Sequence, residues 1–234
     1  MILRRALTGI LLVLLVLLVA VSGCSGSSGT PTPASTTAPP PTASEILAAS
    51  ATAMAEVTSA AFSLTVDGQL PSVTVQSAKG VLNADGDAQG TAAIVQFGQL
   101  IEVEFVLAGG QLYIKGVTGG FTQVPASLAG SVYDPSAILD PTRGVAKVIS
   151  SVQSPTIAGS KGDSWLISGS VPADVAAGLV PGITDDVTGL FTISKGSSEL
   201  TSADLTLDGV DGKPATVKVE LSAFNEPVSI SPPN

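Results

Sequence analysis

The sequence Ile-Glu-Val-Glu-Phe-Val-Leu at residues 101–107 decides the fold class. Apolar residues alternate with Glu102 and Glu104, and this period of two is typical of a strand with one buried and one solvated face. The two carboxylates belong to the solvated face. The opposite face carries the apolar side chains of Ile101, Val103, Phe105 and Leu107.

Further stretches of this kind flank that segment, and turn signals such as Asp67-Gly68 and Gly109-Gly110 separate them. Because consecutive strands joined by short turns pair antiparallel, these stretches predict a long meander. The same alternation places Leu64, Val66, Val73 and Val75 on one face of the neighbouring strands. Strands are predicted at 62–66, 73–75, 92–97, 101–105, 164–168, 190–194, 200–207, 216–221 and 228–230.

Helices interrupt the meander in two places. Thr42 and Glu45 have the spacing of a capping box, and apolar residues at helical spacing predict a helix over 43–59. Asp134-Pro135 and Asp140-Pro141 each place a cap residue before a proline suited to a first helical turn. A further short helix is predicted over 172–180. The fold class is therefore α+β, a long antiparallel sheet with helices covering one face.

The N-terminus has the three parts of an export signal. Arg4 and Arg5 precede an apolar run over 10–21, which is shorter than the roughly 20 residues of a membrane-spanning helix. The run closes with Val-Ser-Gly-Cys24, which resembles the bacterial lipobox. The chain therefore divides into a signal peptide (1–23), a lipidated Cys24 with a Ser/Thr/Pro-rich linker (24–41), and a folded domain (42–234). Cys24 is the predicted lipid anchor, on the extracytoplasmic face of the cell membrane.

Composition excludes several functions. The chain has no His and one Cys, so it lacks the groups for Ser-His-Asp catalysis and for a His-ligated metal. Its net charge of −9 would repel phosphate backbones. The acidic pairs that remain, Asp185-Asp186 and Glu102 with Glu104, are expected in a loop and on a solvated strand face. We therefore predict no enzyme activity, no catalytic residues, no metal site, no cofactor and no nucleic-acid partner.

Small side chains occupy many of the alternating apolar positions, and aromatic residues make up only 4% of the chain. A sheet face of Ala and Val leaves space that other groups must fill. Helices could fill it completely, or the space could hold a ligand. The pattern alone leaves both possibilities open.

A set of collinear segments resembles one known family. The segments are Leu64-Thr-Val-Asp-Gly68, Phe105-Val-Leu before Leu112-Tyr113, and Tyr133-Asp-Pro135 before Arg143-Gly144. They are similar to the LppX/LprA/LprF/LprG lipoproteins of the mycobacterial cell envelope. Residues 153–159, Gln-Ser-Pro-Thr-Ile-Ala-Gly, resemble the LprF branch most. The chain departs from the family at Phe224-Asn225, where members carry Trp before Gly.

The resemblance implies a strongly curved antiparallel half-barrel, with helices on its concave face and an apolar cavity between the layers. It also implies that the cavity takes di- and triacylated glycolipids for transport or presentation across the envelope. Matching to the family places Ala92 and Ile94 inward, where alternation cannot decide. An envelope transporter or sensor protein is left open as a partner. The alternative is a scaffold or signalling lipoprotein with a filled core that binds a protein partner. Under this hypothesis the cavity is lined by Leu64, Val66, Val73, Val75, Ala92, Ile94, Ile101, Val103, Phe105 and Leu107.

Overall fold

The computed structural model describes residues 39–70, 74–116, 119–125, 135–179 and 183–233. Cys24, the predicted signal peptide, most of the predicted linker, Val73 and Asp134 lie outside these residues. The strands are β1 (Ser59–Asp67), β2 (Val75–Asn83), β3 (Ala88–Gln96), β4 (Gln99–Ala108), β5 (Gln111–Lys115), β6 (Thr122–Gln123), β7 (Gln153–Lys161), β8 (Ser164–Val171), β9 (Val187–Ser194), β10 (Leu200–Asp208) and β11 (Pro214–Ser222). The helices are α1 (Ala43–Ala55), η1 (Pro135–Leu139), α3 (Val145–Ser150), α4 (Ala173–Leu179) and η2 (Val210–Gly212).

Within the described ranges, eleven strands form one antiparallel sheet in the order β6-β5-β4-β3-β2-β1-β11-β10-β9-β8-β7. The sheet is an open half-barrel, because its edge strands β6 and β7 do not pair. The first strand, β1, and the last strand, β11, pair in its middle, and Leu64 lies opposite Val219. The α+β half-barrel expected from the sequence is confirmed.

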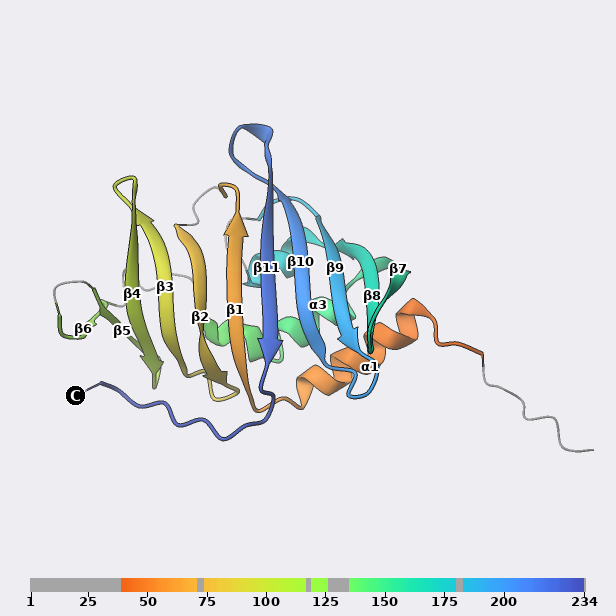
Figure 1. The fold of residues 1–234 in the computed structure, drawn as a ribbon, viewed down its shortest axis with the longest axis horizontal. Coiled ribbons are helices and arrows are strands. Elements are labelled where there is room, and N and C mark those ends of the chain that lie inside the picture. The colour runs from red at the N-terminus through yellow and green to blue at the C-terminus, as the bar shows by residue number, and fades with distance from the viewer. Residues whose placement is uncertain (1–38, 71–73, 117–118, 126–134, 180–182, 234) are drawn as a thin grey trace, which may run out of the picture. The chain divides into compact units, whose positions relative to one another are not determined.

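The chain order explains why the helices cover one face. β6 and β7 follow each other in the sequence but lie at opposite edges of the sheet. The segment between them must therefore cross the sheet, and it contains η1 and α3. Figure 1 shows these helices together with α1 behind the sheet, across the strands from β2 to β8. They form the second layer of the domain, on the concave face.

Helix α1 begins as its sequence predicts. The backbone N–H of Glu45 donates to Thr42 Oγ1 at 3.3 Å, and the N–H of Thr42 donates to Glu45 Oε2 at 2.8 Å. This reciprocal pair satisfies two amides that no helical carbonyl reaches. The hydrogen bonds that Thr42 donates, first from its backbone and then from its side chain, lower the pKa of Glu45. The helix ends at Ala55, earlier than predicted, and the N–H of Thr58 instead donates to Asn225 Oδ1 at 2.8 Å.

The Asp140-Pro141 motif forms a compact turn and not the predicted helix cap. Asp140 Oδ1 accepts from Thr142 Oγ1 at 2.7 Å and from the N–H of Thr142 at 2.8 Å. Gly144 then stands at the N-cap of α3, where a Cβ would lie 2.7 Å from the carbonyl oxygen of Ala137. The close approach excludes any larger residue from this position. The expected cap is therefore displaced by four residues.

These hydrogen bonds predict a pH dependence. The donors, first the Thr142 side chain and then its backbone N–H, lower the pKa of Asp140 from 3.8 to about 2. A lowered pKa gives stability that is present above pH 4 and is lost as the pH falls toward 2. We expect Asp140→Asn to reduce the free energy of unfolding at neutral pH by about 1 kcal/mol, after discounting for partial exposure. Its unfolding free energy should also fall less than that of the wild type between pH 4 and pH 2 in denaturant titrations. Equal slopes for the two proteins would contradict this account.

The predicted strand at 228–230 is wrong. Val228 and Ile230 lie in an extended tail without strand pairing, and Pro227 precedes them. Proline cannot donate to a sheet ladder, and two further prolines follow at 232–233. The tail is instead held at its start, where Ser59 Oγ donates to the carbonyl of Glu226 at 2.6 Å.

Candidate functional site

The inward face of β4 is the one that alternation predicts. Val103 and Phe105 are buried, with 8% exposure each, and Ile101 is half-buried. Glu102 and Glu104 are exposed on the outer face, where Glu104 pairs with Lys115 at 2.9 Å. The alternation therefore separates an apolar inner surface from a charged outer one.

Strand register extends this inner surface across the sheet. Val103 pairs with Ala92, Ala92 with Ala78, Ala78 with Leu64, and Leu64 with Val219. Directly paired residues project from the same face of a sheet. Register therefore places Ala92 inward, which sequence alternation alone could not decide.

The structure brings nine of the ten candidate lining residues to this one face, and the tenth, Val73, lies outside the described residues. Their placement is established here, whereas a role in lining a ligand site remains a prediction. Five are buried and four are half-buried. The buried residues are Leu64, Val66, Val75, Val103 and Phe105. The half-buried residues are Ala92, Ile94, Ile101 and Leu107.

Some inward residues escaped the sequence analysis. Leu112 and Ile114 of β5 pair with Leu107 and Phe105, so they extend the same face. The alternation in Gln-Leu-Tyr-Ile-Lys at 111–115 was a usable signal, although five residues are a short one. Ala78 was missed because β2 contains Lys79 and Gly80, which obscure its apolar period.

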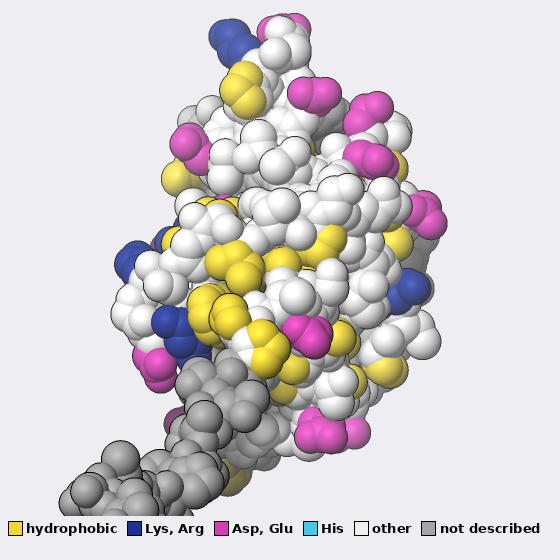
Figure 2. All heavy atoms as spheres, turned by 90° about the vertical axis from the view of Figure 1, so that its right-hand side faces the viewer, with side chains coloured by type: hydrophobic (Ala, Val, Ile, Leu, Met, Phe, Trp, Pro, Cys, Tyr) yellow, Lys and Arg dark blue, Asp and Glu magenta, His cyan; other side chains and the backbone are white. Residues whose placement is uncertain are grey.

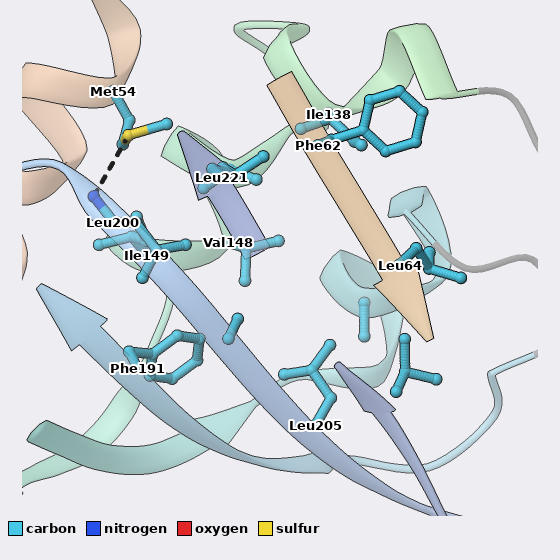
Figure 3. Packing of buried hydrophobic residues seen from close by; sticks show 14 of the residues in the cluster. Met54, Phe62, Leu64, Ile138, Val148, Ile149, Phe191, Leu200, Leu205 and Leu221 are labelled. Carbon is cyan, nitrogen blue, oxygen red and sulfur yellow. Dashed lines mark hydrogen bonds between the residues drawn. The ribbon is translucent and has the colours of Figure 1, made fainter. Parts of the chain in front are cut away.

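Helices close over one half of this face, the half formed by β1 and β8–β11. Phe191 is 0% exposed and Ile149 is 1% exposed. Figure 3 shows Val148 and Ile149 of α3 pointing toward sheet residues that include Phe191. Met54 Sδ of α1 accepts from the backbone N–H of Leu200 at 3.4 Å. We call this region the covered half.

The covered half contains a small apolar cavity between its two layers. Its volume is about 30 Å³, and its lining includes Leu64, Val148, Phe191 and Ala203. That volume is close to the share of a single water molecule in the liquid, whereas ligand pockets usually measure about 300–1,000 Å³. This cavity, as the described residues enclose it, is therefore too small for a large ligand.

Three strands on the other side of the sheet, β3–β5, form what we call the open half. Apart from Gln96 and Gln99 at the β3–β4 turn, every inward residue on these strands is apolar or a glycine. Five of the apolar ones are only half-buried: Ala92, Ile94, Ile101, Leu107 and Ile114. No helix among the described residues lies behind β3–β5 in Figure 1. The open half is therefore an apolar concave surface without a helical cover in the described part of the chain.

A pair of glycines lies between the two halves. Gly80 and Gly90 are cross-strand partners, and Phe62 and Phe105 flank them in the same row. The strands approach so closely there that a Cβ on Gly80 would lie 2.8 Å from the Cα of Gly90. Glycine at such a position lets a sheet bend sharply. This close glycine pair lies where the covered half meets the open half.

The described interior of the domain is poor in polar groups. Ser50 and Ser59 are the buried polar residues in the described ranges, and no buried residue there is charged. Asp186 accepts from the N–H of Ala173 at 3.0 Å at the start of α4, and Asp185 accepts from Thr184 Oγ1 at 2.9 Å. Both acids therefore lie in the loop before β9, as expected. Among the described residues, no three or more His, Cys, Asp or Glu side chains are grouped so that they could hold a metal.

Apolar side chains also reach the surface at one edge of the sheet. Figure 2, which looks from the β7 side, shows them gathered in the middle of this view with acidic side chains around them. Ile157 of β7 is 43% exposed. Among the described helices, none is long and apolar enough to cross a membrane.

Comparisons of sequence and of structure with known proteins point to the same group of lipoproteins. The LppX_LprAFG lipoprotein pattern matches residues 42–230. The lipoarabinomannan carrier protein LprG of Mycolicibacterium smegmatis is 31% identical over 205 residues, which cover 84% of this chain and 85% of that protein. The crystal structure of LprF from Mycobacterium bovis has a TM-score of 0.69 at 25% identity and covers 82% of this chain and 96% of that one. LppX from Mycobacterium tuberculosis shares the fold, with a TM-score of 0.60 at 21% identity over 80% of this chain and 98% of that one.

Proposed function

Because the chain belongs to the LppX_LprAFG lipoprotein family, we propose that it is a lipid-anchored carrier of di- and triacylated glycolipids. It holds their acyl chains on the concave face of the half-barrel and transports or presents them across the cell envelope. The similar protein LprG is named a carrier of lipoarabinomannan, which is a glycolipid. The proposed cargo class follows that similarity and the apolar inner face.

The observation that carries this proposal is the open half. Apart from Gln96 and Gln99 at the β3–β4 turn, its inward side chains are apolar, and Ala92, Ile94, Ile101 and Leu107 remain half-buried. Each methylene group moved from water onto such a surface gains about 0.8 kcal/mol. An acyl chain of ordinary length would therefore be held without any hydrogen bond, while a sugar headgroup stays in water.

The small cavity indicates where acyl chains bind first. The covered half is packed around a space of about 30 Å³, so an acyl chain would have to separate its layers. The open half needs no such displacement. We therefore place the first acyl chain over β3–β5, with further chains entering between the layers as α3 and η1 move away from the sheet.

The anchor and linker hold the carrier at the membrane. Acylated Cys24 attaches the chain to the extracytoplasmic leaflet, and residues 25–41 are rich in Ser, Thr and Pro. An extended Pro-rich chain of this length reaches roughly 50 Å at about 3.1 Å per residue. The domain can therefore leave the bilayer surface while remaining attached to it. It needs no catalytic group for this role, and an envelope transporter or sensor is a candidate partner.

One observation favours a second function, a scaffold lipoprotein that binds a protein partner. The cavity inside the covered half measures only about 30 Å³, as expected for a scaffold with a filled core. The two functions differ in whether lipid occupies the concave face. They are separated by lipid analysis of the purified protein.

The test is mass spectrometry of organic extracts from the purified chain carrying Cys24→Ala, so that its own acyl groups do not contribute. We expect about one diacylated or triacylated glycolipid per protein when the chain is produced in a mycobacterial host, since each buried acyl chain contributes many methylene groups of binding energy. The matched control is the same chain treated with detergent before extraction. Absence of lipid from the untreated protein would reject the carrier and leave the scaffold.

A further inference from the structure

The hairpin that joins β3 to β4 ends in an exposed apolar tip. Phe97 is 98% exposed, Leu100 is 65% exposed and Val95 is 38% exposed. Val95 and Leu100 pair on the outer face of the hairpin, and Ile94 and Ile101 pair on the inner face. In Figure 1 this turn stands at the upper left end of the sheet. The tip therefore carries exposed apolar residues on both faces and at its end, with the uncharged pair Gln96 and Gln99 beside the turn.

The backbone at the tip has a conformation that is strained for Phe97. Phe97 has φ 51° and Gly98 has φ 78°. Two consecutive residues with positive φ make the tight two-residue turn that favours Asn-Gly, and a bulky side chain at positive φ is an outlier. Asn would suit the turn better than Phe97. Strain of this kind is characteristic of functional sites, and here it exposes an aromatic ring.

The tip also lacks charge. Residues 88–101 contain no Asp, Glu, Lys or Arg, although the chain carries a net charge of −9. The turn between β10 and β11 provides a contrast, because Val210 is 38% exposed there beside Asp208 and Asp211. The charged neighbours favour an aqueous position for that second turn. The β3–β4 tip has no charged residue that would oppose its transfer out of water.

We propose that the β3–β4 tip inserts into the interfacial region of a lipid bilayer. A groove on a protein would cover one face of the hairpin, whereas a bilayer surrounds both faces and the end, which matches the distribution of apolar residues. Aromatic side chains favour this depth, and the uncharged Gln96 and Gln99 beside the turn can hydrogen-bond to headgroups there. Beyond this pair, Ile94 and Ile101 lead into the open half, so an acyl chain that leaves the bilayer meets an apolar path. This path rests on the proposed carrier function, and the contact with the bilayer is tested separately.

The contact is tested by fluorescence of the full acylated chain, held by its own anchor in vesicles of phosphatidylethanolamine and phosphatidylglycerol. All variants carry Trp165→Phe, so that one introduced Trp reports its surroundings. We expect Phe97→Trp to emit at shorter wavelength and to be quenched by lipids with doxyl-labelled acyl chains. Val210→Trp is the matched control. Its emission should show neither the shift to shorter wavelength nor quenching by these lipids. Equal quenching in the two variants, or none in Phe97→Trp, would overturn the proposal.

The role of the tip in uptake has its own measurement. The chain starting at residue 24 with Cys24→Ala is mixed with vesicles that contain a diacylglycerol glycoside with a pyrene-labelled acyl chain. We expect Phe97→Asn to lower the initial rate of uptake about tenfold, as loss of one buried aromatic side chain weakens bilayer contact by at least that factor. Its thermal midpoint should equal or exceed that of the wild type, because Asn relieves the strained turn. Unchanged uptake by Phe97→Asn would overturn the role of the tip. Absence of uptake by the wild type would reject the carrier and leave the quenching result standing.

Discussion

Ala92→Trp is expected to remove most of the bound lipid while leaving the fold intact. Ala92 projects inward from β3 in the open half, where it is only half-buried, so an indole has space there. The ring would occupy the surface that several methylene groups of an acyl chain need. At about 0.8 kcal/mol for each methylene group, lipid recovered with the protein should fall about tenfold or more. The measurement is lipid quantification together with thermal unfolding of delipidated protein, because bound lipid itself raises apparent stability.

Two control variants give this prediction its contrast. Ala203 lies on the same inner face but in the covered half, where it lines the small cavity and is 7% exposed. Ala203→Trp should overpack that core by about 1–3 kcal/mol or more and lower the thermal midpoint by several degrees, at about 2–4 °C for each kcal/mol. Ala93 pairs with Glu102 on the outer face, so Ala93→Trp should leave lipid content unchanged. Undiminished lipid in Ala92→Trp, with the protein folded, would show that acyl chains do not occupy the open half.

Cys24→Ala is expected to transfer the protein from the membrane to the aqueous phase almost completely. The thiol of Cys24 is the single site for acylation in the sequence. One acyl chain gives only weak membrane binding, about 10⁴ M⁻¹, and stable anchoring requires two signals, so complete loss of acylation leaves little affinity. The measurement is partition between detergent and aqueous phases, together with the mass of the N-terminal peptide.

The control for this variant is thermal unfolding. Residues Pro40–Asn234 form one compact unit that does not include Cys24. The thermal midpoint should therefore remain that of the wild type after delipidation. A Cys24→Ala protein that still enters the detergent phase would place the anchor elsewhere and contradict the proposed processing of the chain.

The sequence predicted those features of the fold that depend on local alternation. On β4, Glu102 and Glu104 mark the outer face without ambiguity, and the structure places them there. On β3 both faces are apolar, so only pairing of Ala92 with Val103 determines which residues point inward. Register is a property of two strands together, and a single sequence does not contain it. The family resemblance supplied that assignment instead.

Strand β7 shows why part of the fold escaped prediction. Ser154 has φ 48°, Pro155 cannot donate to a ladder, and the pairing with β8 shifts in register at this point. Such interruptions are tolerated because β7 is an edge strand. They also erase the period of two that would identify a strand in the sequence. The division into a covered half and an open half was equally hidden, because it depends on the path of the chain from β6 to β7.

The pairing of β1 with β11 has a consequence for how the chain folds. Leu64 and Val219 meet across about 150 residues, so a large loop must close before the middle of the sheet can form. Folding that depends on distant pairs is slow, and here it cannot finish until the C-terminal strand has been synthesised. For the export that the N-terminal sequence predicts, we therefore expect the earlier strands to remain without their central partner, so that the chain stays unfolded during translocation. Under that prediction, folding is completed only when Pro214–Ser222 has also crossed the membrane.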